Sequence, residues 1–121
     1  MITHPRTDEL ARSVAMWIDE IRPSLDPRNA FLARVASNAM ATIGRELTLG
    51  PAAEADAVAG MAEVLGHAGA FTDLNTELCA RIRSGELTVE TPGLLTALTA
   101  MAKNQIAIDQ PSYRPEGTPP P

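Results

Sequence analysis

Four polar side chains interrupt an otherwise aliphatic stretch, FLARVASNAMATIGREL at residues 31–47, and they are the first candidates for chemistry. Arg34, Asn38 and Arg45 are spaced by four and seven residues, which places them along one side of a helix. Their types suit hydrogen bonding to a protein partner or to an anionic ligand. We therefore interpret Arg34, Asn38 and Arg45 as a polar rim, which meets either a partner or solvent.

Glu46 falls elsewhere on the same helix, among aliphatic residues in the half that we expect to face the core. A carboxylate in that position is costly unless it is paired. We expect Glu46 to be a buried structural residue that pairs with an arginine of a neighbouring helix. The alternative is a small enzyme or ligand carrier that uses Glu46 with Arg34 or Arg45 in a pocket between helices.

Asp109 and Tyr113 are two further candidates, both near the C-terminus. Asp109 lies near the end of a predicted helix, where the helix dipole favours a cation, so its presence suggests a specific bond elsewhere. Tyr113 is the only tyrosine, and its ring either covers the end of the bundle or contacts a partner. We include both residues among the candidates for partner binding.

Motifs for catalysis and for metal binding are absent from the sequence. His4 and His67 belong to no His-x-x-x-His or Glu-x-x-His pair, so we predict no metal site and no di-iron bundle. There is no phosphate-binding loop and no nucleophile elbow. Cys79 is the only cysteine, which excludes an internal disulfide and favours a packing role. We predict a chain that is not an enzyme by itself and that holds no cofactor.

The elements that position these residues follow from helix start and stop signals. Thr7 precedes two acidic residues, and proline follows Asp26, Gly50 and Thr91, which is typical of a first helical turn. The predicted helices are residues 7–22, 26–50, 51–65, 72–84 and 91–109. The predicted fold class is all-α, a compact bundle of about five helices with mostly antiparallel neighbours, because the connections are short. Residues 7–110 form this domain, between an N-terminal tail (1–6) and a Pro-rich tail (111–121).

Composition narrows the class of partner. The net charge is −5 and no run of Lys or Arg is long enough to follow a phosphate backbone, so we expect no nucleic-acid partner. No apolar run approaches the roughly 20 residues that span a bilayer, and we expect no membrane association. The N-terminal residues lack the apolar stretch of a signal peptide, and we expect a cytoplasmic protein.

Three stretches resemble one family: NAFLARVASNAMATIGRELTLGPAAEA, LNTELCARIRSGEL and LLTALTAMAKNQIAIDQPSY. This is a domain-of-unknown-function family of small bacterial helical proteins, encoded beside aminoglycoside-phosphotransferase-like kinases and acyl-CoA dehydrogenases. The chain resembles in particular the small subunit of the hydroxyacyl-CoA kinase of levulinate catabolism. The resemblance covers about residues 5–113, and the ordered series of motifs is diagnostic although no single motif is.

The resemblance implies a noncatalytic accessory subunit that binds and activates such a kinase in acid catabolism. ATP and magnesium would then belong to the kinase, and an acyl-CoA dehydrogenase-like protein would act in the same pathway. The family supplies no catalytic residues to transfer. Two alternatives stay open: a small acyl-CoA-binding or other ligand-binding protein, with or without its own activity, and a purely structural homodimer.

Overall fold

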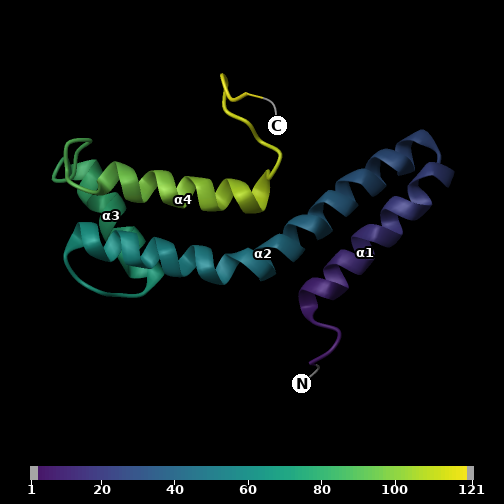
Figure 1. Cartoon of the computed structure of the whole chain (residues 1–121), viewed down its shortest axis with the longest axis horizontal. Coiled ribbons are helices and arrows are strands. Elements are labelled where there is room, and N and C mark those ends of the chain that lie inside the picture. The colour runs from purple at the N-terminus through teal and green to yellow at the C-terminus, as the bar shows by residue number, and fades with distance from the viewer. Residues whose placement is uncertain (1–2, 120–121) are drawn as a thin grey trace. The chain divides into compact units, whose positions relative to one another are not determined.

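A computed structural model describes residues 3–119 (Figure 1). The elements in chain order are α1 (Thr7–Ile21), a 3-10 turn (Arg22–Ser24), α2 (Pro27–Leu65), α3 (Phe71–Ser84) and α4 (Leu94–Asp109). The described residues contain no strand, which confirms the all-helical class. The chain divides into two compact units, Met1–Pro51 and Ala52–Pro121. The outermost residues of the predicted tails, 1–2 and 120–121, lie outside the described residues.

The local signals set most helix ends. The Asp26 carboxylate accepts a hydrogen bond from the backbone N–H of Asn29 at 3.3 Å, and α2 begins at Pro27 as predicted. The hydrogen bond from the Asn29 side chain, together with this backbone hydrogen bond, holds the pKa of Asp26 below its usual value. α3 ends at Gly85, whose φ of 81° is the left-handed conformation that closes a helix.

Residues 3–119 form four α-helices rather than the roughly five that we predicted, and the difference lies at Gly50-Pro51. Proline lacks an N–H and clashes with the residue before it, and both effects usually end a helix. α2 nevertheless runs through Pro51 without interruption. The preceding residue is glycine, which has no Cβ to clash with the proline ring, and Gly50 does not take a left-handed φ. The glycine that we interpreted as a stop instead accommodates the proline.

The first unit is a pair of antiparallel helices, α1 and the N-terminal part of α2, joined by the 3-10 turn (Figure 1). Small residues form the seam between them. The buried Ser37 hydroxyl donates a hydrogen bond to the Ala15 carbonyl at 3.3 Å. Gly44 is buried, and a Cβ built on it would lie 3.9 Å from the Ala11 Cβ. Only Ala11 and Ala15 are buried hydrophobic residues in this unit, within the part of the chain that the structure describes.

Most large hydrophobic side chains of the first unit are exposed, contrary to our expectation that they face a core. Leu32, Val35, Ile43 and Leu47 are all exposed. Helical periodicity identifies an apolar side of a helix but does not say which side a neighbour contacts. In this unit α1 packs on the side of α2 that carries Ser37 and Gly44, where small side chains allow the two backbones to approach.

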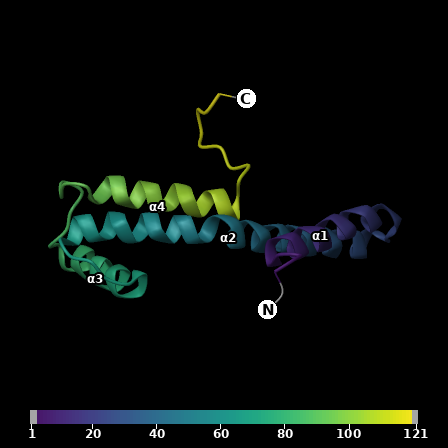
Figure 2. The ribbon, with the colours of Figure 1, turned by 60° about the horizontal axis from the view of Figure 1, so that its bottom comes forward.

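The second unit has an aliphatic core of conventional kind. α4 runs alongside the C-terminal part of α2 in both views, and α3 packs on another side of α2 (Figure 2). α2 and α4 approach closely at Gly60, where an added Cβ would lie 3.4 Å from the Ala97 Cβ. Seven residues form the buried cluster: Ala57, Met61, Leu65, Leu74, Leu78, Leu87 and Leu94. Leu87 comes from the segment between α3 and α4, so this segment also contributes to the core.

A histidine links the turn after α2 to α3. The His67 ring contacts the Ala68 carbonyl through Nδ1 at 3.1 Å and the Glu77 carboxylate through Nε2 at 2.7 Å. Glu77 also accepts a hydrogen bond from Arg81. The hydrogen bond to the Ala68 carbonyl and the hydrogen bond and charge of Glu77 raise the pKa of His67, because both favour the protonated ring.

Candidate functional site

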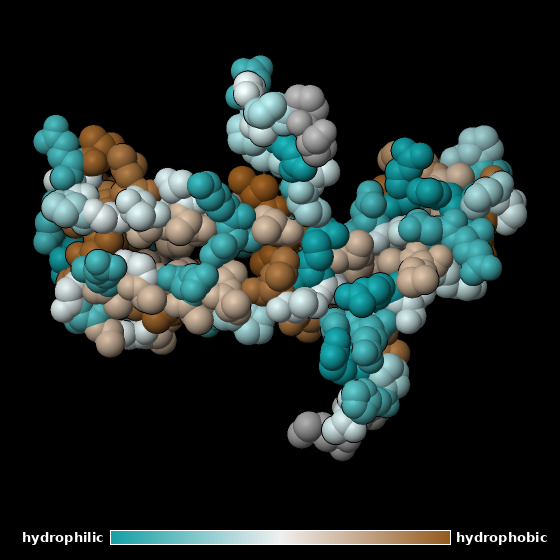
Figure 3. Space-filling model, viewed as in Figure 1, coloured by the Kyte–Doolittle hydropathy of each residue, from teal (hydrophilic) through white to brown (hydrophobic). Residues whose placement is uncertain are grey.

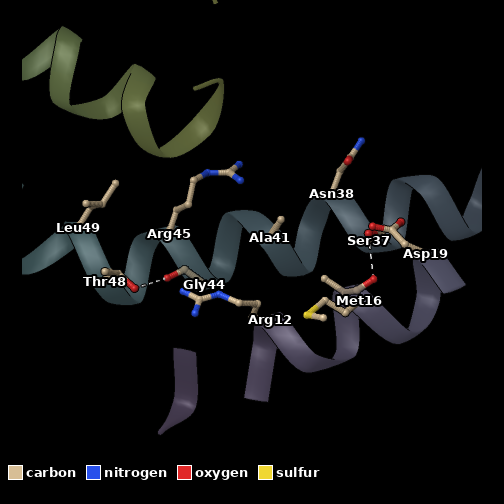
Figure 4. A pocket seen from close by; sticks show the side chains of 11 residues that line it. Arg12, Met16, Asp19, Ser37, Asn38, Ala41, Gly44, Arg45, Thr48 and Leu49 are labelled. Atoms are coloured by element: carbon tan, nitrogen blue, oxygen red, sulfur yellow. Dashed lines mark hydrogen bonds between the residues drawn. The ribbon is translucent and has the colours of Figure 1, made fainter. Parts of the chain in front are cut away.

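An open groove runs between α1 and α2 in the first unit, with a volume of about 470 Å³ (Figure 4). Small residues of the helix seam form its floor, and longer side chains stand along its two edges. The lining residues are Arg12, Ala15, Met16, Asp19, Ser37, Asn38, Ala41, Gly44, Arg45, Thr48 and Leu49. The groove therefore combines an apolar, small-residue floor with polar edges of both charges.

Two residues of the predicted polar rim, Asn38 and Arg45, line this groove from α2. Figure 4 shows that both side chains point away from α1. An Arg45 guanidinium nitrogen donates a hydrogen bond to the Thr42 hydroxyl at 3.1 Å. Arg34, the third rim residue, lines a neighbouring hollow of about 360 Å³ near the 3-10 turn. The rim thus follows one side of α2, as its spacing predicts, and contributes to two adjacent hollows.

The opposite edge of the groove comes from α1, which carries Arg12, Met16 and Asp19 (Figure 4). Sequence reasoning did not connect these residues with the rim. Their spacing of four and three residues marks one side of α1. Which side of α2 these three residues face depends on how the two helices pack. That packing was hard to predict because small residues, which form the contact between the helices, give a weaker periodic signal than large ones.

The groove has no arrangement that suggests a reaction. Its buried hydroxyl, on Ser37, is already bonded to the Ala15 carbonyl. Asn38 and Arg45 diverge from α1 rather than converging with Arg12 on one point (Figure 4). Catalysis needs groups aimed at a common reacting atom, whereas a protein surface needs only complementary shape and charge.

Glu46 does not occupy the buried, paired position that we predicted. It is exposed, and its side chain lies along α2, where a Cβ built on Gly50 would come 2.8 Å from the carboxylate oxygen Oε1. The prediction assumed that the aliphatic half of this helix faces the core of the chain. Because that half is itself exposed, Glu46 needs no buried partner. It also does not line the groove that Arg45 lines.

Asp109 and Tyr113 belong to the second unit. Asp109 is the last residue of α4, and its carboxylate accepts a hydrogen bond from the Gln105 side chain at 2.9 Å. Tyr113 is half exposed, and its backbone N–H donates to the Gln110 carbonyl at 2.9 Å in the turn after α4. Both side chains are accessible on the surface of this unit.

Among residues 3–119, no group of three or more His, Cys, Asp or Glu side chains lies close enough to hold a metal ion. No described helix is both long enough and apolar enough to span a membrane. Cys79 is half-buried on α3.

Fold and groove together define an all-helical protein with an aliphatic core in one unit and a small-residue helix pair in the other. The chain belongs to the family described as Domain of unknown function (DUF6285), whose model matches residues 23–113. The match includes α2, α3 and α4 and leaves α1 outside. No curated protein and no solved structure matches the chain significantly.

Proposed function

We propose that this protein is a noncatalytic interaction subunit, and that its first unit is the part that binds other proteins. One observation carries the proposal: among its described residues this unit buries only alanines as hydrophobic residues, and it leaves most of its large apolar side chains exposed. A folded unit normally gains stability by burying such side chains, at roughly 1.5–3 kcal/mol each. Large exposed apolar areas mark interaction sites on soluble proteins.

The partner that we propose is an aminoglycoside-phosphotransferase-like kinase that acts on a hydroxyacyl-CoA in acid catabolism. This part of the proposal rests on the sequence resemblance, and ATP and magnesium would be bound by the kinase. An acyl-CoA dehydrogenase-like protein in the same pathway is the second proposed partner. The polar rim, with Arg12 and Asp19 across the groove, offers hydrogen-bonding groups of both charges for the kinase contact.

Co-expression tests this proposal directly. The chain and a kinase of the proposed class should elute together in size exclusion, and the kinase should be more active with the chain than alone. Arg45→Ala should weaken the complex about tenfold or more if the groove edge is central to the interface. Arg83→Ala on the exposed side of α3 is the matched control, and it should leave the complex intact. Separate elution with unchanged kinase activity would refute the proposed function.

The groove volume favours a second candidate, a small-ligand-binding protein, because ligand pockets start at roughly 300 Å³. Arg12 from α1 and Arg45 from α2 would then each contact a different anionic group of the ligand, such as separate CoA phosphates. Calorimetry with acyl-CoA on the isolated chain separates the two candidates. Binding that Arg12→Ala and Arg45→Ala each abolish would establish the ligand-binding function, and no heat at any concentration would exclude it.

A further inference from the structure

The two sides of the first unit differ sharply in charge. On α1, Arg12 and Asp19 lie on the side of the groove. Leu10, Val14 and Trp17 follow the spacing i, i+4, i+7 and form a separate stripe, which Ile21 continues. The seam residues Ala11 and Ala15 separate the two stripes. The apolar stripe of α1 therefore lies on the side away from the groove and carries no charged residue.

The N-terminal part of α2 repeats this arrangement. Asn38 and Arg45 line the groove on one side of the seam. Ala36, Met40, Ile43 and Leu47 follow the spacing i, i+4, i+7, i+11 on the other side, again without a charged residue. Because both helices turn their polar stripes to the groove, both apolar stripes lie on the opposite side of the pair. We call this side the apolar face: Leu10, Val14, Trp17, Ile21, Ala36, Met40, Ile43 and Leu47.

Most of this face is exposed. Leu10 and Ile43 are each 47% exposed, and Trp17 is 59% exposed. A whole aliphatic side chain presents on the order of 100 Å² to water and a Trp side chain about twice that, so at these exposed fractions the face presents roughly 350–400 Å². The side of the pair that faces the viewer in Figure 3 is by contrast mostly hydrophilic, with hydrophobic side chains at its margins.

We propose that a second copy of this chain covers the apolar face, so that two helix pairs form a four-helix bundle. Two such faces would together bury roughly 700–800 Å² of apolar surface, which corresponds to a weak, concentration-dependent dimer at the small end of protein interfaces, below about 1,200 Å². A face without charges requires no complementary charges from its partner, so it can pair with itself about a two-fold axis. Small residues would then lie between the two helices of each pair, and large side chains would lie between the two pairs. Such a combination of small and large residues fills the core of a helix bundle.

This inference deepens the proposed function, on which it rests in one respect: both use the first unit as the interaction module. It assigns the two sides of that unit to different partners. The second copy takes the apolar face, and the groove and polar rim remain outward on each copy for the kinase. The subunit would therefore be a dimer that presents two kinase-binding surfaces.

Analytical ultracentrifugation of the full chain over a wide range of concentrations tests the dimer. The expected mass is twice 12.8 kDa. Ile43→Glu places a charge in the centre of the apolar face and should give a monomer with unchanged far-UV circular dichroism. Met16→Glu is the matched control, because Met16 is 66% exposed on the groove side, and this variant should remain a dimer. Trp17 fluorescence of the wild-type chain should shift to the red on dilution as the dimer dissociates.

Specific results would overturn this inference. One is a wild-type chain that is monomeric at every concentration, and another is dissociation by Met16→Glu but not by Ile43→Glu. Adding the kinase separates the inference from the proposed function. A monomeric chain that binds the kinase overturns the dimer and leaves the proposed function standing, whereas a dimer that ignores the kinase supports the inference and counts against the proposed function.

Discussion

Gly44 tests whether small residues hold the first unit together. A Cβ added to this buried glycine would lie 3.9 Å from both the Ala11 Cβ and the Asp8 carbonyl oxygen, which is ordinary contact distance. Gly44→Ala should therefore fit without strain. Replacing glycine with alanine inside a helix gains about 1 kcal/mol, and the buried methyl group adds up to about 0.8 kcal/mol. We expect Gly44→Ala to raise the free energy of unfolding by about 1–1.5 kcal/mol.

Gly44→Leu should have the opposite sign. The alanine methyl group already reaches contact distance, so the three further carbons of leucine have no room unless α1 moves away. Overpacking of this kind costs about 1–3 kcal/mol. Urea unfolding followed by the fluorescence of Trp17, which lies on α1, reports the stability of this unit at fixed protein concentration.

Two outcomes would refute the reasoning about the seam. If Gly44→Leu is as stable as Gly44→Ala, α1 does not pack on this side of α2. If Gly44→Ala is destabilising, the two helices are closer than the structure places them. Gly60→Ala in the second unit is a comparison with a tighter contact, because its Cβ would lie 3.4 Å from the Ala97 Cβ. It should gain less stability than Gly44→Ala.

Three further predictions concern single positions. Met61→Ala removes a fully buried side chain from the second unit's core and should cost about 2–5 kcal/mol in urea unfolding followed by circular dichroism. Glu46→Ala should change the free energy of unfolding by less than about 0.5 kcal/mol, because Glu46 is exposed. A loss of several kcal/mol would instead support the prediction that Glu46 is buried and paired. The raised pKa of His67 means that its contribution is present below the unfolded-state pKa of about 6.5 and is lost as pH rises through the higher folded-state pKa. The melting temperature of wild type relative to His67→Ala should fall across that window, and an equal pH dependence of the two proteins would exclude the bond to Glu77.

Helix positions followed closely from the sequence because the signals that set helix ends are local. The predicted ends at Pro27, Ser84 and Asp109 agree with the structure. The start of α4 at Leu94 is three residues later than the Thr91 signal predicted, since Gly93 takes a left-handed φ immediately before the helix. Gly50-Pro51 misled the reasoning because the same two residues either end a helix or continue one, and no local feature distinguishes the two.

The candidate site was only partly predictable. The spacing of Arg34, Asn38 and Arg45 correctly placed them on one side of α2, because helical geometry alone determines that. The contribution of Arg12 and Asp19 depends on how α1 packs against α2, and this packing depends on contacts between residues more than twenty positions apart, such as Ala15 and Ser37. In a single sequence, the small residues that form such a contact cannot be distinguished from small residues on an exposed, alanine-rich side of a helix.

The incorrect placement of Ile43 and Leu47 in a core has a physical reading that connects the sequence to the proposed dimer. Their aliphatic stripe is as regular as the stripes of the second unit, and such regularity is expected where side chains are buried. Ile43 and Leu47 are nevertheless exposed in the described part of the chain. If a second copy covers the apolar face, these residues lie in a core that two chains share. The periodic pattern then predicts burial correctly, and the error lies in assuming that a single chain provides it.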